Sequence, residues 1–150
     1  MSSLVLGYAL TALCSSLLLA AAWCWPRFAR LPFAVLFLAA SAFNAVTALR
    51  DPGVYVTGFA PHAFPPAREF IERVVALAPD AVVLAVAAAQ AVVGLGLAHG
   101  RGVPFHVGVV GATCFLVGIS WLGVGAAFPL NLVLAAGVLL LLRRAREGLP

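Results

Sequence analysis

Long runs without a charged side chain constrain the fold of this 150-residue chain more than any motif does. The runs cover residues 4–25, 31–49, 81–98, 103–123 and 128–142. About 20 apolar residues in a helix cross the roughly 30 Å hydrocarbon core of a bilayer. The last run has only fifteen residues, but Arg143 and Arg144 can extend along it to the interface. We therefore expect an all-α integral membrane protein whose single domain has five transmembrane spans.

The composition excludes an ordinary soluble domain. Hydrophobic residues make up 64% of the chain and charged residues only 9%, whereas soluble domains have about 45–50% and about 25%. The nine basic residues are all arginines, and most lie at the ends of apolar runs, where they orient helices. The partner that they indicate is the lipid bilayer, not nucleic acid. The first run lacks the basic stretch that begins a signal peptide, so we expect it to be retained as a helix.

Charged residues are divided unevenly between two sets of connectors. Residues 50–80 contain seven of the 14 charged residues, three arginines and four acids. Residues 26–30, 99–102 and 143–150 together contain six arginines and one acid. The two sets alternate along a path of five helices, which favours five spans over four or six. The positive-inside rule then places the C-terminus in the cytoplasm and the N-terminus outside, so residues 50–80 form an extracytoplasmic loop.

This loop contains a predicted short amphipathic helix, from about Pro66 to Leu77. Its two faces are apolar (Phe70, Ile71, Val74 and Val75) and charged (Arg68, Glu69, Glu72 and Arg73). Glu69 and Arg73 have the i,i+4 spacing and order that favour an ion pair, and Asp80 has the position of an N-cap for the third span. Two interpretations stay open: a solvated helix on the outer leaflet, or a lid over a site in the outer half of the bundle.

Polar side chains in or beside the spans are the candidate ligand-binding residues, because an unsatisfied polar group in hydrocarbon is costly. They are Asn44, Arg50, Asp51, Tyr55, His62, Gln90, Ser120 and Asn131. One interpretation is hydrogen bonding between helices, worth about 0.6–2 kcal/mol per contact. The other is a polar vestibule open to the outside, with Arg50, Asp51, Tyr55 and His62 at its mouth. No Asp, Glu or Arg lies deep in a span of the sequence, which argues against an ion or proton pathway.

Small residues indicate where helices pack closely. Gly111, Gly118 and Gly125 recur every seven residues with Cys114 between them, and Gly96 and Gly100 form a GxxxG pattern. We expect these residues to pack helices together. The cysteines of the sequence form no CxxC pair, and His99 and His106 have no second pair of ligands on another helix. We therefore expect no metal site.

Residues 31–144 resemble the DoxX-like family of small bacterial membrane proteins. The resemblance lies in SAFNAV (41–46), RDPGVYVTGFAPHAFPP (50–66), the Q-x-x-x-G-L-x-L pattern from Gln90 to Leu97, HGRG (99–102) and Phe128–Pro129. It implies a four-helix transmembrane bundle in the bacterial inner (cytoplasmic) membrane, to which residues 4–25 add one N-terminal helix. The family often has a glutamate where this chain has Gln90, so the resemblance gives a proton-coupled role no support.

These observations predict a small non-catalytic membrane protein that serves as an accessory or assembly subunit of a membrane complex. Its partner would be another membrane protein or a second copy of the chain, and we predict no cofactor. Some DoxX-like proteins are small subunits of quinone-reducing complexes. One alternative is therefore a redox-complex subunit that binds a quinone or another apolar small molecule in the outer half of the bundle. A second alternative is a transporter of small solutes.

Overall fold

The computed structural model describes residues 3–147, and every regular element in this part of the chain is helical. The α-helices are α1 (Ser3–Cys24), α2 (Pro26–Arg50), α3 (Gly53–Phe59), α4 (Pro65–Arg73), α5 (Pro79–His99), α6 (Gly102–Ile119) and α7 (Leu130–Arg146). Three 3₁₀ segments join them: η1 (Ala60–His62), η2 (Val75–Leu77) and η3 (Ser120–Ala126). The predicted all-α fold is confirmed. The end of the basic tail, residues 148–150, lies outside the described residues.

The chain is a multi-pass membrane protein with four candidate spans in its described part. These helical stretches are long and apolar enough to cross a bilayer: Val5–Cys24, Pro26–Arg50, Pro79–His99 and Gly102–Ala126. They correspond to the first four predicted spans. The fifth prediction coincides with α7, which has only 17 residues and carries three arginines in its last turn. The fifth span therefore stays a prediction.

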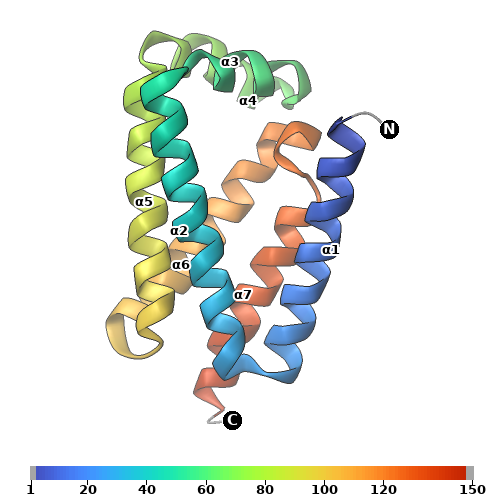
Figure 1. Cartoon of the computed structure of the whole chain (residues 1–150), viewed down its shortest axis with the longest axis vertical. Coiled ribbons are helices and arrows are strands. Elements are labelled where there is room, and N and C mark those ends of the chain that lie inside the picture. Colours follow the sequence, from blue (N-terminus) through green and yellow to red (C-terminus); the bar gives the residue numbers. More distant parts are fainter. Residues whose placement is uncertain (1–2, 148–150) are drawn as a thin grey trace.

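The long helices form two side-by-side pairs joined by α6 (Figure 1). α2 packs along α5, α1 packs along α7, and α6 contacts both α5 and α7. α3 and α4 lie across the end at which α1 begins, which we call the capped end. The turns after α1 and α5 and the end of α7 lie at the opposite end. The arginine-rich connectors thus gather at this second end, which we call the basic end.

Proline and glycine set several helix boundaries. Pro26, Pro65 and Pro79 are the first residues of α2, α4 and α5, where the missing N–H of proline costs nothing. α5 ends at His99, and the next residue, Gly100, caps it with a left-handed φ of 74°. Gly100, predicted to pack helices, instead leaves room for the Arg30 guanidinium. Arg30 Nη1 donates a hydrogen bond of 3.0 Å to a carbonyl oxygen in the last turn of α5 and so satisfies a helix end.

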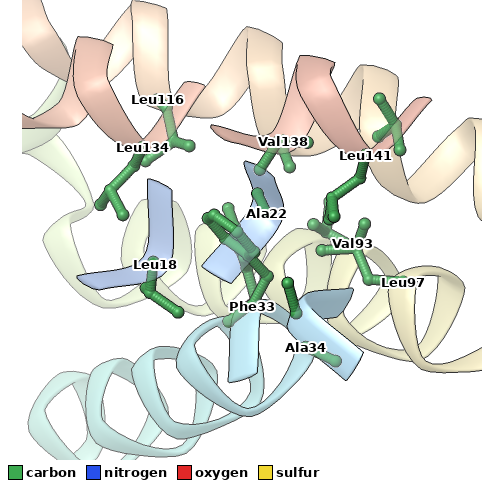
Figure 2. Close-up of a cluster of buried hydrophobic side chains, with 14 of the residues drawn as sticks. Leu18, Ala22, Phe33, Ala34, Val93, Leu97, Leu116, Leu134, Val138 and Leu141 are labelled. Atoms are coloured by element: carbon green, nitrogen blue, oxygen red, sulfur yellow. The ribbon is translucent and has the colours of Figure 1, made fainter. Parts of the chain in front are cut away.

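The apolar core lies toward the basic end, between the two helix pairs. Figure 2 shows side chains that meet there from all five long helices, among them Leu18, Phe33, Leu97, Leu116 and Val138. Phe33, Leu97 and Val138 are fully buried. Many apolar side chains on the outer faces of the same helices are exposed, as expected for helices that contact lipid on one side and protein on the other.

α5 and α6 meet backbone to backbone near the basic end. A Cβ atom on Gly96 would lie 2.5 Å from the Pro104 carbonyl oxygen, and one on Gly108 would lie 2.6 Å from the Leu97 nitrogen. Only glycine permits so close an approach. Gly96 was a predicted packing residue, whereas Gly108 was not. Toward the capped end α6 diverges from α5 (Figure 1).

The glycines of the seven-residue pattern do not all pack helices together as predicted. The last of them, Gly125, lies beyond the end of α6, in η3. Cys114 and Gly118 are exposed, and a Cβ atom on Gly118 would have no neighbour within 4 Å in the described part of the chain. Gly111 alone of this pattern faces α5, through the side chain of Val93. Beyond Gly111 the pattern makes no contact with α5, because the two helices separate toward the capped end.

The loop at residues 50–80 is more helical than predicted, since α3 and η1 occupy a part for which no helix was expected. The predicted amphipathic helix divides into α4 and η2. It buries Ile71 and Val75, while the other two residues of its apolar face, Phe70 and Val74, are exposed. The amphipathic prediction therefore holds for half of the apolar face.

The charged residues of this loop confirm one prediction and correct another. The Arg73 Nη1 and Glu69 Oε1 atoms form the predicted i,i+4 ion pair at 3.0 Å. Asp80, however, is not the N-cap of α5, because the helix already begins at Pro79 and its N-cap position is Ala78, with no side-chain hydrogen bond. Asp80 lies in the first turn, where its charge favours the helix dipole.

Candidate ligand cavity

A cavity of about 530 Å³ lies at the capped end, where α6 separates from α5. α5 contributes Val82, Val83 and Val86 to its lining, α6 contributes Phe115, Gly118 and Ile119, and α4 with η2 contributes Pro66, Ala67, Phe70, Ile71 and Val75. The other lining residues are Asn44, Tyr55, Phe59, Trp121 and Leu122. Among the described residues, no side chain that lines the cavity is charged.

The polar end of the cavity is a chain of three hydrogen-bonded side chains. Tyr55 Oη donates to Asn44 Oδ1 at 2.6 Å, and Asn44 Nδ2 donates to Gln90 Oε1 at 2.7 Å. Asn44 and Tyr55 line the cavity, whereas Gln90 is buried behind them on α5. These two hydrogen bonds join α2, α3 and α5, so the three side chains are held in place from three elements.

α3 places Tyr55 over the end of α2. The Asp51 N–H still donates to the Thr47 carbonyl oxygen at 2.8 Å and completes the last turn of α2. Pro52, with its ring-restricted φ of −65°, then begins the turn into α3. Because α3 starts so soon after α2 ends, it folds back across the bundle and brings the Tyr55 hydroxyl to Asn44. The Tyr55 ring also lies 5.9 Å from the Phe59 ring, centroid to centroid.

Hydrogen bonds attach α4, which covers the cavity, to neighbouring segments. The Phe64 N–H, just before α4, donates to the Trp121 carbonyl oxygen of η3 at 3.2 Å. Arg68 of α4 donates from Nε to the Ala60 carbonyl oxygen at 2.9 Å and from Nη2 to the Pro61 carbonyl oxygen at 3.2 Å. α4 is thereby held to η1 and η3, and η2, which follows it, packs on α5.

Beside α4, η3 and η1 touch through their backbones. Gly123 has a left-handed φ of 71°, and a Cβ atom there would overlap the His62 carbonyl oxygen. A side chain at this position would be strained in two ways, by its backbone conformation and by the contact. His62 therefore contributes its backbone to this junction, and its side chain is exposed.

The structure brings together Asn44, Tyr55 and Gln90 from the predicted binding residues, and it places the other five elsewhere. Arg50 and Asp51 are exposed beyond the end of α2 and do not line the cavity. Ser120 donates to the Leu116 carbonyl oxygen of α6 at 2.8 Å, and Asn131 donates to the Ala126 carbonyl oxygen. These four residues and His62 therefore do not surround a common vestibule.

Most of the cavity wall was not predicted, because its residues carry no distinguishing signal. Val86 and Ile119 face the cavity, yet in sequence they resemble the many valines and leucines that are exposed on the outer faces of the helices. Gly118 was noted for its spacing and interpreted as a packing residue, whereas it forms part of the wall. The missing Cβ atom at this position is one reason why the space exists.

Within residues 3–147, no group of three or more His, Cys, Asp or Glu side chains is arranged to hold a metal ion. His106 Nδ1 lies 2.8 Å from the Gly102 carbonyl oxygen, one turn earlier on its own helix. The side chains of His99 and of the three cysteines are exposed on the helices.

The chemistry of the cavity therefore depends on one polar group of three side chains within apolar walls. Such an arrangement can hold an uncharged molecule by apolar contact and orient it by hydrogen bonds. Comparisons with protein-family models, with curated proteins and with solved structures gave no match for this chain.

Proposed function

We propose that this chain is a non-catalytic membrane protein that holds an apolar small molecule in the cavity at the capped end. The observation that carries the proposal is a space of about 530 Å³ whose lining side chains are apolar apart from Asn44, Tyr55 and the indole N–H of Trp121. Binding sites for small molecules commonly measure about 300–1,000 Å³ and combine apolar walls with a few polar groups. Protein interiors otherwise pack with few voids larger than a water molecule.

A quinone is one candidate occupant. Its ring and isoprenoid chain suit the valine and aromatic walls, and a quinone carbonyl oxygen can accept a hydrogen bond from the Asn44 amide. The resemblance of residues 31–144 to DoxX-like proteins supports this candidate, because some of those proteins belong to quinone-reducing complexes. The chain would then act as an accessory subunit that holds the molecule for a catalytic partner.

We further propose five spans, arranged as a DoxX-like four-helix bundle with α1 added. The 17 residues of α7 would extend about 26 Å at 1.5 Å per residue, and its terminal arginines can reach the interface. The Arg144 guanidinium carbon lies 4.9 Å from the centroid of the Trp23 ring, and Trp121 lies at the capped end. Tryptophans at both ends are typical of the two membrane interfaces.

The basic end would face the cytoplasm of a bacterial cell by the positive-inside rule. The cavity then lies in the outer half of the inner membrane, beneath α3 and α4. A transporter finds less support in this arrangement, because the backbone contact between Gly96 and Gly108 closes the space between α5 and α6 toward the basic end.

Filling the cavity from within tests the proposal. Gly118 lines the cavity, and a Cβ atom there would meet no atom within 4 Å among the described residues. Gly118→Phe should therefore place a ring in the cavity without displacing backbone. Gly7→Phe is the matched control, because Gly7 is also exposed and also has no such neighbour, but lies on α1, away from the cavity.

The measurement is mass spectrometry of apolar molecules that remain bound after purification in a mild detergent. Wild type and Gly7→Phe should retain the same molecule, and Gly118→Phe should retain at least about tenfold less, since each 1.4 kcal/mol of lost affinity is tenfold. Thermal unfolding followed by circular dichroism checks that both variants are folded. Equal retention by a folded Gly118→Phe variant, or no retained molecule in the wild type, would refute the proposal.

A further inference from the structure

We infer that the cavity selects an apolar molecule with an uncharged hydroxyl head group, which hydrogen-bonds to Asn44 and Tyr55. The inference rests on the proposed function and adds the chemical class of the ligand. It follows from counting the hydrogen-bonding atoms that remain unused at the polar end of the cavity and from the charge of the cavity lining.

The unused capacity of Asn44 and Tyr55 includes one donor and at least one acceptor. Tyr55 gives its only hydroxyl proton to Asn44 Oδ1, so the Tyr55 oxygen offers lone pairs alone to a ligand. Asn44 Nδ2 has two protons and gives one to Gln90, so one N–H stays available. A ligand hydroxyl can donate to Tyr55 and accept from Asn44 at the same time, whereas a carbonyl group can only accept.

This count does not depend on how the two amide groups are oriented. If both amides are turned over, Gln90 donates to Asn44 Oδ1 and Asn44 donates to the Tyr55 oxygen. The Tyr55 hydroxyl proton then becomes available as a donor beside the second Asn44 N–H, and Asn44 Oδ1 keeps a lone pair. Either orientation leaves at least one donor and at least one acceptor on these two side chains, which is the pair that a single hydroxyl satisfies.

The lining also disfavours a charged head group. The sixteen lining residues include no Asp, Glu, Arg or His, and the described arginines nearest to lining residues in sequence, Arg68 and Arg73, do not line it. A carboxylate or ammonium group placed here would lose its hydration without gaining an opposite charge, which is costly in an apolar site. A fatty acid should therefore bind less tightly than the corresponding alcohol.

Access to the cavity from the bilayer fits a long apolar ligand. α5 and α6 separate toward the capped end (Figure 1), and the exposed Gly118 forms part of both the wall and the lipid-facing surface. α4 and η2 cover the cavity on the other side, where Ile71 of α4 and Val75 of η2 are buried. An alkyl chain can thus extend between the helices into lipid while its head group lies at Asn44.

The test compares four probes built on a chain of sixteen carbons: hexadecanol, hexadecyl methyl ether, hexadecane and palmitate, whose carboxylate includes the sixteenth carbon. Their affinities for the purified full-length protein are measured by native mass spectrometry in one detergent at neutral pH. Hexadecanol should bind about tenfold more tightly than hexadecane, since two net hydrogen bonds of about 0.5–1.5 kcal/mol each favour the alcohol. The ether, which only accepts, should bind with intermediate affinity, and palmitate should bind less tightly than hexadecanol.

Variants assign the preference to the two side chains. Tyr55→Phe and Asn44→Leu each remove one of the two hydrogen bonds, so each should lower the affinity for hexadecanol to about that of the wild type for the ether, and both should leave the affinity for hexadecane unchanged. Ser41→Ala is the matched control. It removes a 2.6 Å hydrogen bond to the Ala87 carbonyl oxygen, which joins α2 to α5 as the Asn44 amide does, but Ser41 does not line the cavity. If Asn44→Leu does not fold, Tyr55→Phe decides, because it removes one oxygen atom and no packing.

The outcomes separate this inference from the proposed function. Equal affinities of the wild type for hexadecanol and hexadecane, with both lost in Gly118→Phe, would overturn the hydroxyl preference and leave an apolar binding site. Tightest binding of palmitate would overturn the neutral head group. Binding of none of the four probes to the wild type would overturn both, because a hydroxyl preference requires a cavity that takes apolar chains.

Discussion

A methyl group added to Gly96 should destabilise the bundle, because α5 and α6 touch through their backbones at this residue. A Cβ atom there would lie 2.5 Å from the Pro104 carbonyl oxygen and 3.0 Å from both the nitrogen and the Cα atom of Gly108. All three atoms belong to the backbone of α6, so no side-chain rotation can relieve the contact. The two helices would have to move apart, and the packing around Leu97 would loosen with them.

The size of the effect follows from two opposing terms. Alanine is more stable than glycine in a helix interior by about 0.5–1 kcal/mol. Forcing an extra methyl group into a packed interior costs about 1–3 kcal/mol. Gly96→Ala should therefore lower the free energy of unfolding by up to about 2 kcal/mol, whereas Gly7→Ala, whose Cβ atom would meet nothing within 4 Å in the described chain, should not lower it.

The assay is unfolding in mixed micelles of a mild detergent and dodecyl sulfate, followed by circular dichroism. Subtracting the Gly7→Ala result from the Gly96→Ala result removes the helix-propensity term and leaves the cost of overpacking, about 1–3 kcal/mol. Gly94→Ala should fall between them, because its Cβ atom would meet chiefly the Leu38 side chain, 2.7 Å from Cγ, which can rotate. Equal stability of the Gly96 and Gly7 variants would refute the backbone contact.

Two further predictions concern the basic end and the orientation in the membrane. Arg30→Ala should lower the free energy of unfolding by about 0.5–1.5 kcal/mol in the same assay, because it removes the 3.0 Å hydrogen bond to the Ala98 carbonyl oxygen; no loss would mean that this carbonyl group is satisfied by water. In a variant without native cysteines, Thr57→Cys should react with a membrane-impermeant maleimide on intact bacterial cells, and Arg146→Cys should react only after lysis. The reverse pattern would invert the proposed orientation.

The sequence alone predicted the long helices well, because a bilayer span depends on a local property, the length of an apolar run. The second run, residues 31–49, lies within α2, and the third and fourth runs coincide with most of α5 and α6. The sequence also identified Asn44 and Gln90, since a polar side chain within an apolar run is conspicuous. That these two side chains hydrogen-bond to each other across 46 residues of sequence depends on how α2 and α5 pack, which no local pattern contains.

α3 and the cavity wall were not predictable for two physical reasons. Gly53–Phe59 contains two glycines, two valines and a threonine, which are poor helix formers, so α3 forms through contacts with the rest of the capped end. α5 and α6 are apolar on every face, because one side contacts lipid and the other contacts protein. Periodicity therefore cannot tell a valine that lines the cavity from one that faces the bilayer.

The position of the glycines explains why a cavity exists at one end of the bundle and a core at the other. α5 and α6 cross at Gly96 and Gly108, and Ile119 lies 11 residues further along α6, roughly 16 Å at 1.5 Å per residue. Transmembrane pairs commonly cross at about 20–40°, which separates the helix axes by roughly 6–11 Å more at that distance. Side chains the size of Val86 and Ile119 are too short to fill so wide a gap, and α3 and α4 cover it rather than fill it. The cavity is thus the geometric consequence of a close glycine contact at the opposite end, so moving that contact should change the proposed binding even though neither glycine lines the cavity.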